Sequence, residues 1–358
     1  MRISEIKNVM QSVIIQNYEN IKKGASKDRL IALYIQGGVG QGKTSAVRSM
    51  TTDQLILDAV QRIFGQKIDK LEFSNLGLAM FDPAELAGWC VPNADQQSMT
   101  RLRPEFLPKD GFGILFVDEV AQATLMHHNI FGQLVDERRL GNHYLGDGWI
   151  IISAGNRLKD KAGSNKLPSQ LRDRFTYLDL EIDLDDLLKY YAENNVDPRI
   201  SSWLKFDDQY LYQFDVNADS NCTPRSVERA STLMNLGLDS LSLRGVLSGQ
   251  IGETASGSLI AHMKLYDKLP DFDSLVKDPS NTAIPEDRGV LYALCGSLAS
   301  KMTMENCSPI LTYMQRIPEQ EYMAFMLKDA VMRNKTLVTS PAMKAVLGSQ
   351  GKLKDLLL

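Results

Sequence analysis

An apolar run, Leu30-Ile31-Ala32-Leu33-Tyr34-Ile35, leads after one residue into Gly37-Gly38-Val39-Gly40-Gln41-Gly42-Lys43-Thr44. The run predicts a buried strand, and the residues from Thr44 onward can open a helix. In this context the pattern G-x-x-x-x-G-K-[ST] is typical of a loop whose backbone N–H groups surround a phosphate. Lys43 would reach the β- and γ-phosphates, and the Thr44 hydroxyl would ligate Mg²⁺. A glycine-rich turn without a ligand is the alternative, but the flanking strand and helix favour a nucleoside triphosphate site.

The chain outward from this loop alternates between strands and helices. Apolar positions in residues 3–22 follow a helical period, which predicts a leading helix. Strands are expected at Leu30–Ile35, Lys70–Phe73, Gly113–Val117, Trp149–Ser153 and Thr176–Leu180. This alternation predicts a three-layer α/β domain with a mostly parallel sheet. From residue 185 onward the pattern is helical, so we expect three parts: a nucleotide-binding core at 1–183, a helical domain at 184–250 and a helical C-terminal extension at 251–358.

Composition is that of an ordinary globular protein. Of the 358 residues, 44% are hydrophobic and 23% are charged, and the net charge of −4 supplies no basic field for nucleic acid. No apolar run is long enough to span a membrane. Residues 1–7 carry charges where a signal peptide would need an apolar core, so a cytoplasmic location is expected.

Cysteine and histidine offer no metal site. Cys90, Cys222, Cys295 and Cys307 are scattered and contain no C-x-x-C pair, which favours four reduced thiols. His127-His128 is the one histidine cluster, and adjacent helical residues point to different faces. We therefore expect these two side chains to flank a solvated surface.

Two of the expected strands end in polar residues that suit phosphate chemistry. Gly113–Val117 runs into Asp118 and Glu119. Asp118 would hold Mg²⁺ through water, and Glu119 would act as general base toward the attacking water. The strand from Trp149 ends near Asn156, whose amide can both donate to the γ-phosphate and accept from water. Solvated acids at a strand end, and simple turn chemistry for the asparagine, are the competing interpretations.

Three arginines could reach a transferring phosphoryl group. Arg174, before the last strand, is the first choice for an arginine supplied by a neighbouring subunit, and Arg172 is the second. An ion pair of Arg174 with Asp173 or Asp179 is the alternative. Arg225 follows Thr223-Pro224, a predicted helix start, and could reach over the γ-phosphate unless it is an ordinary surface arginine.

These elements, in this order, resemble the AAA+ ATPases. The resemblance assigns Walker A to the glycine loop, Walker B to Asp118-Glu119, sensor 1 to Asn156, the arginine finger to Arg174 and sensor 2 to Arg225. The candidate nucleotide-binding residues are Gly37, Gly38, Val39, Gly40, Gln41, Gly42, Lys43, Thr44, Ser45 and Asp118, with Thr44 and Asp118 as metal ligands and Glu119, Asn156, Arg174 and Arg225 as catalytic residues.

Further segments look like the MoxR-like, dynein-related branch that includes midasin. The stretch from Glu85-Leu86-Ala87-Gly88-Trp89 to Pro108 is similar to its helix-2 insertion, and residues 138–145 to its pre-sensor-1 hairpin. Residues 167–175 are similar to its arginine-finger stretch, and residues 184–194 to its lid entry. Sensor 1 departs from the pattern, because Ser153-Ala154-Gly155-Asn156-Arg157 stands where many relatives have Ala-Thr-x-Asn-Pro.

The resemblance implies an ATP-hydrolysing homo-oligomeric ring, usually hexameric, that alternates between ATP and ADP and remodels a partner protein. The partner often carries a von Willebrand factor A domain. A DNA-directed motor of the replication or restriction type is the alternative, which the acidic balance disfavours. A third hypothesis is a scaffold that binds ATP without hydrolysing it, and the Asp118-Glu119 pair argues against this.

Overall fold

The computed structural model describes residues 1–94, 97–157 and 166–349. It divides the chain into two compact units, Met1–Glu181 and Ile182–Leu358, which are described separately below. Within the described part, no helix combines the length and the apolar character that crossing a membrane requires.

The first unit is built on a five-stranded parallel sheet in the part of the chain that is described. The strand order is β2-β5-β8-β1-β9, so β1, which precedes the glycine loop, pairs with both β8 and β9. The strands are β1 (Ala32–Gln36), β2 (Glu72–Gly77), β5 (Gly113–Asp118), β8 (Trp149–Gly155) and β9 (Phe175–Asp179). All five predicted strands are confirmed, although β2 begins two residues later than expected and runs to Gly77.

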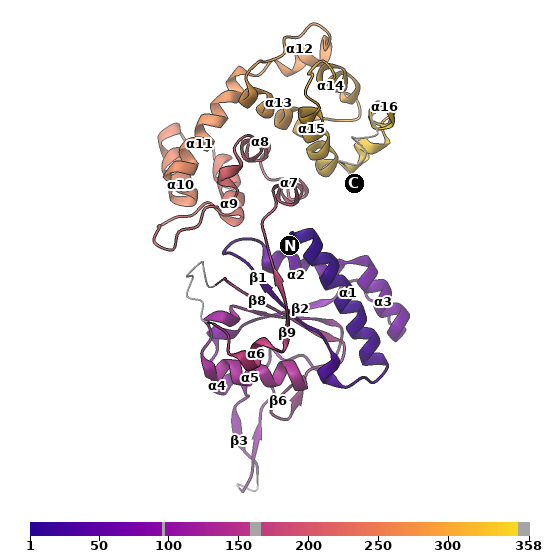
Figure 1. Ribbon diagram of the computed structural model, residues 1–358, viewed down its shortest axis with the longest axis vertical. Helices are drawn as coiled ribbons and strands as arrows, with labels where there is room; N and C mark the ends of the chain where they lie inside the picture. The colour runs from indigo at the N-terminus through magenta and orange to yellow at the C-terminus, as the bar shows by residue number, and fades with distance from the viewer. Residues whose placement is uncertain (95–96, 158–165, 350–358) are drawn as a thin grey trace. The chain divides into compact units, whose positions relative to one another are not determined.

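Helices cover both faces of this sheet (Figure 1). Alternate residues of β1 point to opposite faces: Leu33 and Ile35 pack with α1, α2 and α3, whereas Ala32 and Tyr34 pack with α4, α5 and α6. Both faces are therefore buried, as is usual for a parallel sheet. The helices are α1 (Ile3–Lys22), α2 (Lys43–Ser49), α3 (Gln54–Phe64), α4 (Pro83–Leu86), α5 (Leu125–Glu137) and α6 (Ser169–Arg172), with 3-10 turns at Lys27–Arg29, Met50–Thr52, Leu78–Met80 and Val120–Gln122. The three-layer α/β prediction is confirmed.

Two small hairpins interrupt the alternation of strand and helix. The first, between β2 and β5, pairs β3 (Cys90–Pro92) with β4 (Met99–Arg101), and it extends away from the sheet in Figure 1. The second pairs β6 (Arg139–Leu140) with β7 (His143–Tyr144) directly before β8. Arg138 joins the start of this hairpin to the segment that leads into β8, because its buried guanidinium donates to the carbonyls of Gly146 and Trp149.

The second unit is built from helices, and its described residues contain one isolated antiparallel bridge, between Gln213 and Cys222. One cluster of buried side chains runs from Tyr191 to Leu259, and a second is formed mainly by the later helices. The helices are α7 (Leu184–Glu193), α8 (Pro198–Phe206), α9 (Pro224–Met234), α10 (Ser240–Ile251), α11 (Glu253–Met263), α12 (Phe272–Lys277), α13 (Arg288–Lys301), α14 (Cys307–Met314), α15 (Gln320–Arg333) and α16 (Pro341–Ser349), with 3-10 turns at Asp208–Leu211, Lys264–Lys268 and Lys335–Thr339. The boundary expected at residue 250 stays a prediction.

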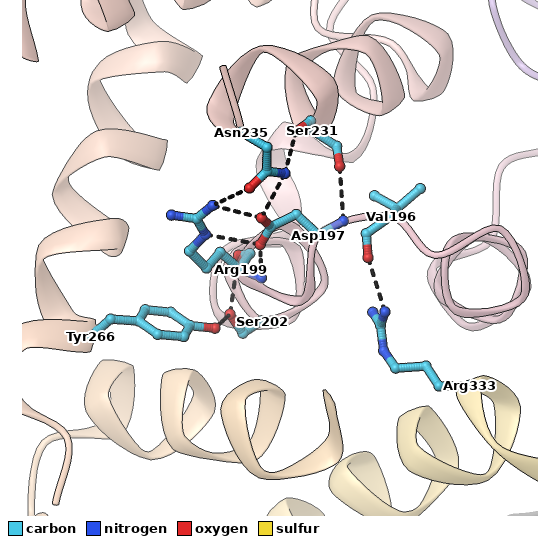
Figure 2. Close-up of polar contacts among 8 residues, drawn as sticks. All are labelled: Val196, Asp197, Arg199, Ser202, Ser231, Asn235, Tyr266 and Arg333. Atoms are coloured by element: carbon cyan, nitrogen blue, oxygen red, sulfur yellow. Dashed lines mark hydrogen bonds and ion pairs between the residues drawn. The ribbon is translucent and has the colours of Figure 1, made fainter. Parts of the chain in front are cut away.

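A polar network around the start of α8 joins several helices of this unit (Figure 2). The buried Asp197 carboxylate accepts from the Arg199 guanidinium at 2.6 Å and 2.9 Å and from the Asn235 amide at 3.2 Å. The backbone N–H of Asp197 donates to Ser231 in α9, and Arg333 in α15 donates to the carbonyl of Val196. These bonds tie the N-terminus of α8 to the end of α9 and to α15.

Candidate active site

The glycine loop forms the turn between β1 and α2. Gly40 and Gly42 have φ values of 72° and 85°, in the left-handed region where a Cβ atom is disfavoured, and Gly42 directly precedes the helix. The Gln41 side chain accepts from the backbone N–H of Gly38 at 2.7 Å and closes the loop on itself. A Cβ atom at Gly37 would crowd the same Gln41 oxygen. The glycines therefore allow the backbone conformation that the motif predicts, because positive φ at Gly40 and Gly42 and the close approach at Gly37 disfavour a Cβ atom.

Lys43 connects this loop to the end of β8. Its buried Nζ donates to the carbonyls of Gly37 and Gly38, both at 2.9 Å, and to Oδ1 of Asn156 at 3.0 Å. Lys43 and Asn156 are 113 residues apart in the chain. They meet because β1 and β8 are neighbouring parallel strands whose carboxyl ends lie at the same edge of the sheet.

Thr44 and Asp118 meet at this same edge. The Thr44 hydroxyl, in the first turn of α2, donates to Asp118 Oδ2 at 3.3 Å from the end of β5. A hydroxyl and a carboxylate are hard oxygen ligands and fit Mg²⁺, which commonly takes its remaining ligands from water and substrate phosphates. Among the described residues no group of three or more His, Cys, Asp or Glu side chains could hold a metal ion. A metal ion here would be held by the Thr44 and Asp118 oxygens together with water and the phosphate oxygens of a bound nucleotide.

Glu119 has an unusual backbone conformation for a residue with a side chain. Its φ of 56° and ψ of 28° place it in the left-handed helical region, and its N–H donates to Asp118 Oδ1 at 2.9 Å. This conformation costs a residue with a Cβ atom roughly 1–2 kcal/mol. Such local strain is often found at functional sites. The role of general base for Glu119 stays a prediction.

The two arginines near β9 have different surroundings. Arg174 pairs with Asp136 of α5, with Nε and Oδ2 2.7 Å apart, so its ion pair is with neither Asp173 nor Asp179. Its guanidinium lies over Gly132, where a Cβ atom would overlap it. Arg172 instead lines a cavity together with Asn156. Sequence reasoning missed Asp136, because nothing in the chain near Arg174 marks a partner that lies 38 residues away.

Arg225 belongs to the second unit, where it is exposed in the first turn of α9. The predicted helix start is confirmed: Thr223 caps the helix by accepting from the N–H of Ser226 at 3.3 Å, and Pro224 occupies the first turn. The first unit thus brings together the loop, Asp118, Glu119 and Asn156. Arg225 lies outside it, and its role stays a prediction.

The expectation for the two adjacent histidines is wrong. His127 and His128 are 6% and 4% exposed and do not flank a solvated surface. His127 Nε2 bonds to the carbonyl of Phe81 at 2.8 Å, and His128 Nε2 bonds to that of Val120 at 2.7 Å. The reason is that α5 is covered on more than one side, so two faces of the helix meet carbonyl groups of the segments packed against it.

No protein-family model and no curated protein matches the sequence. Among solved structures, the chain is similar to NtrX from Brucella abortus, with 14% identity over 95% of this chain and 67% of that one and a TM-score of 0.36. It is also similar to the RuvB Holliday junction branch migration motor of Thermotoga maritima, with 15% identity over 82% of this chain and 81% of that one and a TM-score of 0.36.

The order of the five parallel strands, and the helices on both faces of the sheet, follow from the structure of this chain alone. The first unit is a three-layer α/β domain in which the ends of three adjacent strands carry the glycine loop, Asp118 and Asn156 to a single edge.

Proposed function

We propose that this chain is an ATP hydrolase of the AAA+ type. The observation that carries the proposal is the convergence of Lys43 with Asn156 and of Thr44 with Asp118 at one edge of the sheet. The loop supplies backbone N–H groups and a buried ammonium for phosphate oxygens. The strand ends supply a carboxylate pair and an amide for the attacking water. All of these groups occur together in enzymes that transfer a phosphoryl group to water.

In the proposed mechanism the chain positions the phosphates and the water. The Lys43 ammonium group, which donates to carbonyls of its own loop, would donate to the phosphate oxygens when a nucleotide is bound. Thr44 and Asp118 would hold Mg²⁺, which offsets the negative charge of the β- and γ-phosphates. Asn156 would orient the attacking water and Glu119 would accept its proton. Since little covalent chemistry falls to the protein, placement and charge carry most of the rate.

The finer proposal is an intersubunit site in a ring, and it rests on the resemblance described above. Arg174 of a neighbouring copy would stabilise charge on the γ-phosphate, with Asp136 holding the guanidinium in place, and Arg225 would contact the same phosphate. The assembly would be a homo-oligomer, hexameric in the usual case, in the cytoplasm. It would remodel a partner protein that carries a von Willebrand factor A domain. Stimulation of phosphate release by such a protein, if it is encoded by a neighbouring gene and added in purified form, would support the proposed partner.

Steady-state phosphate release tests the hydrolase proposal. We expect Glu119→Gln to lower turnover roughly 10²–10⁴-fold, the range for loss of a general base, while a fluorescent ATP analogue still binds. The matched control is Glu105→Gln, an exposed glutamate of the same unit, which should leave turnover unchanged. Full turnover in Glu119→Gln would remove the base assignment. Binding of ATP by the wild-type chain without phosphate release would instead favour the scaffold hypothesis.

Mixing two inactive variants tests whether Arg174 acts on a neighbouring subunit. Glu119→Gln chains carry an intact Arg174, and Arg174→Ala chains carry an intact Glu119. In mixed rings the first would complete the site of the second, so the mixture should regain phosphate release that neither variant shows alone. A mixture that assembles but stays inactive would mean that both residues act within one subunit.

A further inference from the structure

A cavity of about 350 Å³ opens next to the proposed active site, on the face of the sheet that α5 and α6 cover. Its wall takes side chains from β1, β9 and α6 and from the residue directly after β8. The lining residues are Tyr34, Gln36, Ala121, Asn156, Lys166, Leu167, Arg172 and Tyr177. Tyr34 and Gln36 belong to no motif of the sequence, and their alternate positions on β1 place them on one face of the sheet.

The polar lining of this cavity favours an anion. Lys166 and Arg172 contribute two positive charges, and none of the described lining residues is acidic. Within the described part of the chain, neither cation is found in an ion pair or a hydrogen bond, whereas Arg174 nearby is paired with Asp136. Two unpaired cations around one cavity concentrate positive potential there.

Neutral groups in the wall can donate hydrogen bonds to the same anion. The rings of Tyr34 and Tyr177 lie 4.9 Å apart on paired strands. Burial raises the pKa of both hydroxyls, so they stay protonated at neutral pH and can donate. The amides of Gln36 and Asn156 add further N–H donors. Together with the two cations, these groups form the kind of donor set that binds a phosphate.

Asn156 connects the cavity to the site of hydrolysis. Its side chain lines the cavity and also accepts from Lys43, which in the proposed mechanism holds the γ-phosphate. A phosphate cleaved beside Lys43 would therefore lie close to the basic cavity, which shares Asn156 with the proposed active site. We propose that this cavity is a binding site for inorganic phosphate, occupied after hydrolysis, with Arg172 as its main ligand within the same subunit. The proposal rests on the proposed function for the source of the phosphate, though binding itself can be measured without hydrolysis.

Equilibrium binding of radiolabelled inorganic phosphate to the ADP-bound protein tests this site. Loss of one charge-assisted hydrogen bond predicts that Arg172→Gln weakens phosphate binding about tenfold or more. The matched control is Arg62→Gln, an exposed arginine of α3, which should bind phosphate as the wild type does. Equal binding by wild type and Arg172→Gln, or equal weakening by Arg62→Gln, would overturn the proposal. Failure of hydrolysis alone would leave this measurement intact and would count only against the proposed function.

A second measurement separates released phosphate from the γ-phosphate of bound ATP. If Arg172 binds the released product, Arg172→Gln should change neither the affinity for ADP nor that for a non-hydrolysable ATP analogue. It should also weaken the inhibition of turnover by added phosphate. If Arg172 instead contacts the γ-phosphate, the variant should lose affinity for the ATP analogue but not for ADP, and phosphate binding should be unchanged. The second pattern would overturn the proposal.

Discussion

Substitution of Asp197 is expected to loosen the second unit at α8 and α9. The Asp197 residue is 9% exposed, and its carboxylate accepts hydrogen bonds from the guanidinium and the backbone N–H of Arg199 and from the Asn235 amide. Removal of one partner of a buried ion pair costs about 3–5 kcal/mol. Because the Arg199 side chain is 26% exposed and can regain water, we expect Asp197→Ala to cost about 3 kcal/mol, at the lower end of that range.

The isosteric variant separates the charge from the helix cap. Asp197 also caps α8, and asparagine caps a helix about as well as aspartate. Asp197→Asn should therefore lose only the charged part of the Arg199 contact, about 1–2 kcal/mol. The matched control is Asp271→Asn at the N-terminus of α12, where the carboxylate accepts from the N–H of Ser274. That variant should leave the hydrogen-exchange protection of α8 and α9 unchanged.

The pH dependence gives the same prediction a second readout. Burial by itself raises the pKa of Asp197, but the hydrogen bonds and charge of Arg199, together with Asn235, outweigh it and hold the pKa below its ordinary value. A lowered pKa in the folded state means that the stabilisation is complete above the unfolded pKa of about 3.9 and is lost as pH falls through the folded value. The difference between wild type and Asp197→Asn should shrink over that acidic window.

Hydrogen exchange resolved by segment is the suitable assay, since a chain with two compact units need not unfold in one step. Amides of α8 and of the end of α9 should lose protection in Asp197→Ala, because Ser231 and Asn235 in and after α9 bond to the Asp197 residue. The amides of β1, β5 and β8 should keep their protection. Unchanged exchange in α8 and α9, or a loss spread equally over the sheet, would refute the reasoning.

Three further predictions concern two glycines of the first unit and the four cysteines of the chain. Gly42→Ala should lower the unfolding free energy by about 1–2 kcal/mol, because φ is 85° although there is room for a Cβ atom. The control Gly245→Ala, in open space within α10, should instead raise the unfolding free energy by about 0.8 kcal/mol. Denaturant titrations in which both variants change the unfolding free energy in the same direction would contradict this. Gly132→Ala should displace the Arg174 guanidinium and lower phosphate release without changing ATP affinity; a parallel loss of both would show that the site itself is disturbed. Cys90 is the exposed thiol among the four cysteines, so Ellman's reagent should label one thiol per native chain quickly and four after denaturation; two or more fast thiols would contradict the burial of the others.

Much of the fold and of the candidate site could be predicted from the sequence, because these features are written in local patterns. The period of apolar residues identified α1 and the five sheet strands, and parallel strands separated by helices admit few arrangements. The glycine loop was also predictable in detail: a turn that needs φ above zero at Gly40 and Gly42 selects glycine there. Asp118 and Asn156 were predictable because polar residues that directly follow apolar strands lie together at the carboxyl edge of a parallel sheet.

Contacts between residues far apart in the chain could not be predicted in this way. Nothing near Arg174 in the sequence indicates that Asp136 forms an ion pair with it. Likewise, nothing near His127 indicates that its ring is hydrogen-bonded to the carbonyl of Phe81. The cavity beside Asn156 likewise depends on Tyr34 and Arg172 meeting across β1, β9 and α6. Hydrogen bonds and ion pairs act over a few ångströms in space, so packing decides which side chains come within reach. Local sequence patterns were therefore enough to predict the phosphate loop and the layers around it, whereas packing in three dimensions sets Arg174 against Asp136 and Arg172 against the cavity.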